Sequence, residues 1–264
     1  MIIAHELSKK FGLLKAVDDL SFKVEAGEIF ALLGPNGAGK TTTIKMILGM
    51  LKSDKGSILF NGKELWFGDN SYKARIGYVP ENCALYENLT GREYLNFIGN
   101  LYHLPPDEIR EKAGSLLQML DLEESSGQLI REYSKGMKQK ILIISALLHN
   151  PELIILDEPF SGLDANSVSI FKQIMREEAA DGKAVIFCSH VLEVVERLVH
   201  RILIMKNGCK LVAGTPEEII RQTGHVSLDR AFNLLTDAGD IEDKAREILK
   251  VIGRKPESNK DEQK

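Results

Sequence analysis

Apolar and polar residues alternate in several short stretches of the first third of the chain. The segments IIAHEL, LSFKV, EIFALL and GSILF have the two-residue period of half-buried strands, with turn dipeptides at 26–27 and 61–62. This early run predicts a separate antiparallel β patch.

The pattern changes after residue 150, where short apolar strands alternate with helices. LIILDEP and AVIFCS are predicted strands, and a helix is expected between them at about 166–180. A short helix, VLEVVERL, and a hairpin turning at Asn207-Gly208 follow. Strand–helix–strand alternation around buried strands favours a mostly parallel sheet in an α/β fold.

The regions between and after these strands are mainly helical. Residues about 85–150 are predicted to form a helical subdomain, so that 1–215 make one unit. Residues 216–253 are expected to be a helical extension. The last stretch, 254–264, is charged and lacks a run of apolar residues, so we expect it to be disordered.

Composition narrows the classes of protein to consider. The 264 residues carry a formal net charge of −4, which argues against a chain that is basic overall and binds nucleic acid. Cys83, Cys188 and Cys209 are widely spaced, so buried, unpaired thiols in a reducing compartment are expected. The amino end does not resemble a secretory signal, and the apolar runs are shorter than the ~18 residues of a membrane span.

A glycine-rich loop at 34–42 has the strongest chemical signal. GPNGAGKTT fits G-x-x-x-x-G-K-[ST] and lies between an apolar strand and a helical pattern, the context that a phosphate-binding loop requires. A glycine-rich turn that matches by chance is the alternative. The expected nucleotide-binding residues are Gly34, Pro35, Asn36, Gly37, Ala38, Gly39, Lys40, Thr41 and Thr42. Lys40 places a charge on the β- and γ-phosphates, and the Thr41 hydroxyl is a candidate Mg²⁺ ligand.

Three further polar residues follow predicted strands. Asp157, at the end of LIILD, suits the Mg²⁺ shell, and Glu158 beside it can polarise the attacking water. His190 follows AVIFCS and is a candidate γ-phosphate contact, since carboxyl ends of parallel strands share one edge. A strand-capping acidic pair and a structural histidine are the plainer alternatives.

A second helix start also suits an anion. In YSKGMKQK, at 133–140, a serine, a glycine and lysines precede the apolar run ILIISALL. A serine hydroxyl, a glycine N–H and the positive end of a helix can together receive a phosphate. An ordinary N-cap serine is the alternative for this stretch in isolation.

Six ordered motifs make the chain resemble the nucleotide-binding subunit of an ATP-binding-cassette (ABC) transporter, similar to bacterial export-type (ABC-2-like) cassettes. They are GPNGAGKT, YVPE, YSKGMKQK, LIILDEP, SGLD and SH, and they span about residues 1–215. The resemblance implies a P-loop NTPase core with a mostly parallel sheet, an antiparallel β subdomain and a helical signature subdomain. It implies ATP and Mg²⁺ as ligands.

The resemblance also implies a second cassette, as a homodimer or a paired similar chain, packed head to tail. Ser134 and Gly136 of one chain then reach the γ-phosphate held at Lys40 of the other. Asp164, in SGLD, is implied to link the two sites, with a simple loop as the alternative. Phe11, in KKFG, matches the aromatic residue that stacks on adenine, although a lone phenylalanine is more often part of a core.

Two motifs depart from the family pattern. YVPE ends in Glu81 where glutamine is usual; the resemblance implies that this residue contacts Mg²⁺ and water, and a carboxylate can still do so. The signature YSKGM has Lys135 and Met137 where LSGGQ has glycine and glutamine. Lys135 is expected either to face solvent or to add charge near the phosphates.

The function implied is an ATP-hydrolysing subunit at the cytoplasmic face of the membrane. It would power a separate transmembrane permease, with export as the expected direction. The permease is expected to dock at residues 82–102, although core packing explains part of this stretch. A soluble ABC ATPase that remodels nucleic acid or ribosomes is the second hypothesis. It is disfavoured by the single cassette and by the acidic net charge. A nucleotide-binding module without turnover is the third hypothesis. The presence of all the expected catalytic and metal-binding residues argues against it: Lys40, Asp157, Glu158 and His190.

Overall fold

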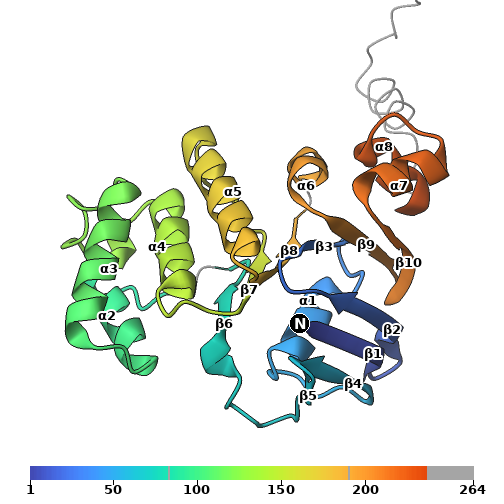
Figure 1. The fold of residues 1–264 in the computed structure, drawn as a ribbon, viewed down its shortest axis with the longest axis horizontal. Helices are drawn as coiled ribbons and strands as arrows, with labels where there is room; N and C mark the ends of the chain where they lie inside the picture. The colour runs from blue at the N-terminus through green and yellow to red at the C-terminus, as the bar shows by residue number, and fades with distance from the viewer. Residues whose placement is uncertain (83, 190, 237–264) are drawn as a thin grey trace, which may run out of the picture.

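A six-stranded sheet forms the centre of the protein, which is described by a computed structural model over residues 1–82, 84–189 and 191–236 (Figure 1). Neighbouring strands are parallel except at one edge, where β10 runs antiparallel to β9. In spatial order the strands are β10 (Cys209–Gly214), β9 (Arg201–Lys206), β3 (Ile29–Leu33), β8 (Ala184–Cys188), β7 (Leu153–Asp157) and β6 (Ile76–Val79).

A smaller antiparallel sheet lies beside it, as the early alternation predicts. Its strands, in spatial order, are β2 (Leu14–Val24), β1 (Ile2–Phe11), β4 (Lys55–Phe60) and β5 (Lys63–Glu64). The segment EIFALL, grouped with these strands in the sequence, instead forms β3 of the parallel sheet. The physical reason is that all five residues of β3 are buried, so this strand needs cover on both faces.

The central strands send alternate side chains into two different cores. Ala31 and Leu33 of β3 join the core under the helices that follow β6, whereas Phe30 and Leu32 join the core shared with the antiparallel sheet. Helix α1 (Lys40–Ile47) contributes Ile44 and Ile47 to the second core. The start of α1 is therefore held firmly against the carboxyl end of β3.

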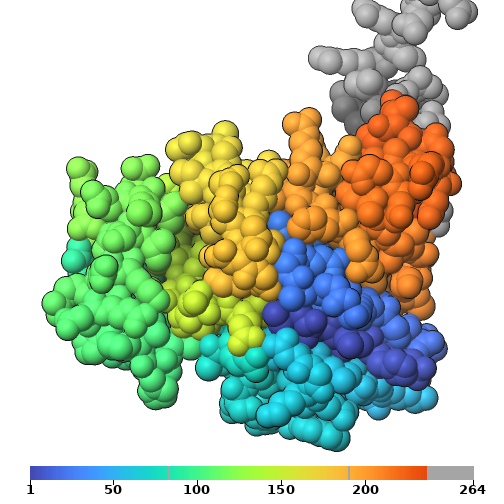
Figure 2. All heavy atoms as spheres, viewed as in Figure 1, coloured from blue at the N-terminus to red at the C-terminus, as the bar shows by residue number. Residues whose placement is uncertain are grey.

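The helical region forms one end of the molecule, drawn in green in Figures 1 and 2. Thr90 and Glu93 form a reciprocal capping box at the start of its first helix, and Pro106 opens the second. Two 3₁₀ turns, η1 (Lys73–Arg75) and η2 (Ile130–Glu132), precede β6 and the last helix of the region. The helices are α2 (Gly91–Leu101), α3 (Pro106–Met119) and α4 (Lys135–Leu147).

The remaining helices pack on the face of the large sheet to which Ala31 and Leu33 belong, and they reach the opposite end of the molecule. They are α5 (Ala165–Ala180), α6 (Leu192–Leu198), α7 (Pro216–Thr223) and α8 (Leu228–Thr236). Ile219 and Leu228 are fully buried in the common core, and the Leu228 N–H donates to Glu196 of α6 at 3.0 Å. The described part of the extension thus packs on the cassette. The rest of it, and the expected tail at 254–264, lie outside the described residues.

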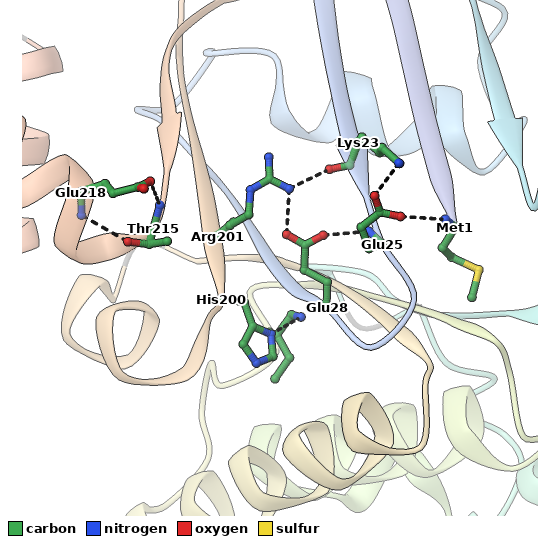
Figure 3. Close-up of polar contacts among 9 residues, drawn as sticks. Met1, Lys23, Glu25, Glu28, His200, Arg201, Thr215 and Glu218 are labelled. Atoms are coloured by element: carbon green, nitrogen blue, oxygen red, sulfur yellow. Dashed lines mark hydrogen bonds and ion pairs between the residues drawn. The ribbon is translucent and has the colours of Figure 1, made fainter.

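Polar contacts fasten the amino ends of β3 and β9, at the edge of the sheet opposite the phosphate loop (Figure 3). The buried Glu28 carboxylate accepts from Arg201 at 3.0 Å and from the Glu25 N–H at 2.7 Å. His200 Nδ1 accepts from the Ile29 N–H at 2.8 Å. These contacts hold the two strands in register, so the loops at their far ends start from a fixed frame.

Two sequence expectations concern cysteines and membrane spans. Cys188 is buried in β8 as expected, but Cys209 is exposed because β10 is the edge strand; both are free thiols, and Cys83 lies outside the described residues. No helix within residues 1–82, 84–189 and 191–236 is long and apolar enough to cross a bilayer.

Candidate nucleotide site

The glycine-rich loop joins β3 to α1 and needs glycine for close backbone approach. A Cβ on Gly34 would lie 2.4 Å from the Met205 carbonyl oxygen, and one on Gly39 would lie 2.3 Å from that of Ala16. Gly39 also has φ of 106°, a conformation that other residues avoid. The loop can therefore pack against β9 and β2 only with these glycines.

Lys40, the first residue of α1, folds back into the loop. Its ammonium donates to the carbonyl oxygens of Gly34 at 2.6 Å and Pro35 at 3.2 Å. The N-terminus of α1 carries no acidic residue in its first turn, so the positive end of the helix and the ammonium lie together. This combination of charge and backbone donors is suited to phosphate groups.

Carboxylates come to the same edge from the ends of two strands. Asp157, the last residue of β7, is 3% exposed, and the Thr41 hydroxyl donates to its Oδ2 at 3.5 Å. Burial, and after it the neighbouring charges of Glu81 and Glu158, raise the pKa of Asp157 to about 6, against the opposing effects of Lys40 and Thr41. A buried carboxylate that faces other carboxylates is a good place for a cation.

Glu158 follows directly and is held by unusual backbone geometry. It has φ of 51°, and its N–H donates to the Cys188 carbonyl oxygen of β8 at 2.9 Å. Strain of this kind in a non-glycine residue is common at functional sites.

One cavity collects most of the predicted residues of the site. Its volume is about 490 Å³, within the usual range for small-molecule sites. Leu14 and Ala16 also line it; they were not predicted, although both follow Phe11 along the β1–β2 hairpin. The lining residues are Phe11, Leu14, Ala16, Asn36, Gly37, Ala38, Gly39, Lys40, Thr41, Thr42, Glu81, Asp157 and Glu158.

Phe11 is half exposed at the rim of this cavity, at the end of β1. The plainer alternative, a phenylalanine of the core, therefore does not hold for this residue. An exposed ring beside a phosphate loop has a free face on which a base can stack.

The predicted signature residues lie elsewhere, at the start of α4. In the described part of the chain, neither Ser134 nor Gly136 lines the cavity. Ser134 caps α4, its oxygen accepting from the Met137 N–H at 3.2 Å, which agrees with the plain N-cap reading. A capping serine whose oxygen accepts a hydrogen bond still has its hydroxyl proton to donate.

Asp164 has a local role that the sequence did not indicate. Its carboxylate caps α5, accepting from the N–H of Ser167 at 2.9 Å and from its hydroxyl at 2.6 Å. These hydrogen bonds to Ser167 lower the pKa of Asp164 to about 2. His190, the remaining predicted residue, lies outside the described residues.

The protein residues fit a magnesium ion that a nucleotide helps to hold. Within the described ranges, no group of three or more His, Cys, Asp or Glu side chains could hold a metal ion. Thr41 and Asp157 nevertheless offer adjacent oxygen donors. Mg²⁺ is commonly bound by one or two protein oxygens together with phosphates and water, so this smaller set suffices.

Comparisons with known proteins place the chain in one family. A family model described as ABC transporter matches residues 17–161. An uncharacterised ABC transporter ATP-binding protein of Methanocaldococcus jannaschii is 39% identical over 225 residues, 85% of this chain and 81% of that protein. Nod factor export ATP-binding protein I of Ralstonia nicotianae is 35% identical over 81% of this chain and 67% of its own length. A solved ATP-binding subunit of an ABC transporter superposes with a TM-score of 0.84 at 36% identity, covering 89% of this chain and 99% of that one.

Proposed function

Because the chain belongs to the ABC transporter family as an ATP-binding subunit, and is an ATPase, we propose that it hydrolyses ATP in sites shared between two cassettes. The single observation that carries this proposal is that the signature residues lie apart from the phosphate-loop cavity of the same chain. The cavity contains the phosphate loop and the carboxylates, whereas the exposed Ser134 and the partly exposed Gly136 lie at the start of α4, outside its lining, where they can serve as a second anion receptor. Head-to-tail packing of two chains brings one chain's receptor to the other chain's phosphates.

Within each site the protein residues have separate tasks. Lys40 and the loop N–H groups hold the phosphates, and the Phe11 ring stacks on the base. Thr41 and Asp157, with Glu81, hold Mg²⁺, which screens phosphate charge during transfer. Glu158 polarises the attacking water, and His190 contacts the γ-phosphate.

ATP then holds the two cassettes together. Its phosphates bridge the donors of one chain's loop and those of the other chain's signature segment. Loss of the γ-phosphate removes that bridge, so the pair can open again. Asp164, already fixed at the start of α5, lies in the SGLD segment that we place along this contact.

A separate permease in the membrane would receive this motion. Its docking surface is the region 82–102, where Tyr86 and Leu101 are 60% and 58% exposed. Tyr86 also packs edge-on against the ring of Phe97 at 5.3 Å, whereas Leu95 is fully buried. Part of the stretch is therefore core, and the exposed apolar part suits a short helix from the partner.

Export is the proposed direction, and the cytoplasmic face of the membrane the proposed location. The similarity to a Nod factor export ATP-binding protein supports export. Fractionation of cells with and without the candidate permease tests the partnership: the cassette should sediment with membranes only when the permease is present. Co-sedimentation with ribosomes or DNA in both cells would contradict the proposal.

Glu158→Gln tests the chemistry. Turnover should fall ~10²–10³-fold, as on loss of a preorganised catalytic contact, while ATP binding persists. With hydrolysis blocked, ATP should convert the variant to a dimer in size-exclusion chromatography. Glu108→Gln is the matched control, since Glu108 pairs with Lys112 on the surface of α3. Unchanged turnover of Glu158→Gln, or a monomer at saturating ATP, would remove the assignment.

A further inference from the structure

Lys135 makes a contact that neither sequence expectation foresaw. Its ammonium donates to the Ser161 hydroxyl at 2.6 Å, although Lys135 belongs to the signature segment and Ser161 to the SGLD segment. The lysine stem covers Gly162: a Cβ added there would lie 2.9 Å from Lys135 Cγ. The side chain therefore spans from the start of α4 to the loop before α5.

Other contacts reinforce this junction. A Cβ on Gly136 would lie 2.6 Å from the Gly162 carbonyl oxygen, so the two backbones nearly touch. The buried Gln139 side chain, one turn further along α4, donates to the Pro159 carbonyl oxygen at 2.9 Å. The first turn of α4 and residues 159–162 thus form one packed unit.

That loop is continuous with the catalytic carboxylate. The Ser161 N–H donates to the Glu158 carbonyl oxygen at 3.2 Å, which closes a tight turn. A shift of Ser161 therefore displaces Glu158 through a single turn of backbone. Since Glu158 already has a strained φ of 51°, its orientation depends on what holds this turn.

The neighbouring lysines of the same segment point to other elements. Lys138 pairs with Glu87 at 2.6 Å, and Lys140 donates to the Leu120 carbonyl oxygen at 3.1 Å. Both contacts stay within the helical region. Among these three lysines, Lys135 alone reaches the loop that follows Glu158.

We propose that Lys135 is a positioning residue that couples the two composite sites of the cassette dimer. The signature segment of a chain contacts the nucleotide on its partner, while Glu158 of that chain serves its own nucleotide. Through Ser161, Lys135 makes the position of one depend on the other. This inference rests on the proposed function, and it assigns a role to a lysine that replaces the family's usual glycine.

A double-mutant cycle tests the contact. Lys135→Met keeps the apolar stem and removes the charge, and Ser161→Ala removes the acceptor. Each should lower kcat about fivefold, or about 1 kcal/mol, with KM for ATP within twofold. The double variant should be no slower than either single variant, because the two residues act through one contact. Lys135→Arg, which keeps a donor, should recover at least half of the turnover.

Cooperativity supplies a readout that a merely structural role would not change. The Hill coefficient for ATP should exceed 1 in the wild type and fall towards 1 in Lys135→Met, with the melting temperature unchanged. Lys112→Met, which removes a partly exposed lysine paired with Glu108 on α3, should change neither value.

The contradicting outcomes are distinct. Additive effects of the two substitutions on kcat would overturn the coupling. A raised KM for ATP in Lys135→Met, together with unchanged kinetics in Ser161→Ala, would also overturn it, since Lys135 would then act on phosphate directly. Failure of the proposed function is recognised separately: Glu158→Gln with intact Lys135 would not dimerise in ATP.

Discussion

Gly136→Ala is the substitution for which the structure gives the sharpest expectation. The new Cβ would lie 2.6 Å from the Gly162 carbonyl oxygen and 4.0 Å from Ser134 Oγ. The first distance is too short for a carbon–oxygen contact, and its partner is backbone, which cannot rotate away. The signature segment and the SGLD loop must therefore separate.

The size of that movement can be worked out. Ordinary van der Waals contact begins at 3.4 Å, so the required separation is 3.4 − 2.6 = 0.8 Å. A misplacement of about 1 Å in a catalytic constellation can cost ~10²-fold in rate, so turnover should fall by about that factor. Overpacking of this kind costs about 1–3 kcal/mol, and the better helix propensity of alanine offsets up to about 1 kcal/mol, so the free energy of unfolding should fall by no more than about 3 kcal/mol.

Steady-state ATP hydrolysis and thermal unfolding together check this prediction. Gly114→Ala is the matched control, because Gly114 lies within α3 and an added Cβ there would meet nothing within 4 Å. The control should keep full turnover. If Gly136→Ala kept half of the wild-type turnover, the close packing of the two loops would not matter for catalysis and the reasoning would be refuted.

Two other perturbations have definite expected outcomes. Lys40→Ala should weaken ATP binding ~10–100-fold in equilibrium titration, as on loss of a hydrogen bond to a charged group, and unchanged affinity would contradict its role. Burial lowers the pKa of His149 from 6.5 to about 4, against the opposing hydrogen bond to the Ile76 carbonyl. Because the folded protein then binds fewer protons, stability should fall as pH drops from about 6.5 to 4, by up to about 3 kcal/mol. His149→Phe, which can keep the stacking on Tyr102, should lose less stability over that window in denaturant titrations at each pH; an equal loss would argue against a neutral His149.

Much of the fold could be predicted because local pattern and tertiary environment agree. The hairpin at Asn207-Gly208 is confirmed, and so are helices within residues 85–150, one of them opened by Pro106, since turn chemistry and helix capping are local. The membership of β3 could not be predicted in this way. Its apolar run fits either sheet, and only the cover that distant helices give to both faces decides between them.

The candidate site shows the same division. The phosphate loop and Asp157 were predictable because their geometry follows from a strand end and a helix start. The partner of Lys135 was not, because a long flexible side chain can reach several acceptors and the choice of Ser161 depends on how α4 packs on the SGLD loop. The capping of α5 by Asp164 was not predicted, because the SGLD motif implies contacts between chains and does not indicate a local hydrogen bond.

The shared nucleotide site is tested most directly by mixing two inactive chains. Lys40→Ala lacks a working phosphate loop and Ser134→Ala lacks a working signature, so each should be nearly silent alone. Mixed dimers join the intact loop of one chain to the intact signature of the other. Turnover should recover to at most about a quarter of the wild-type rate, because half of randomly formed dimers are mixed and each has one complete site of two. Silence of the mixture, with mixed dimers verified by native mass spectrometry, would contradict the composite site.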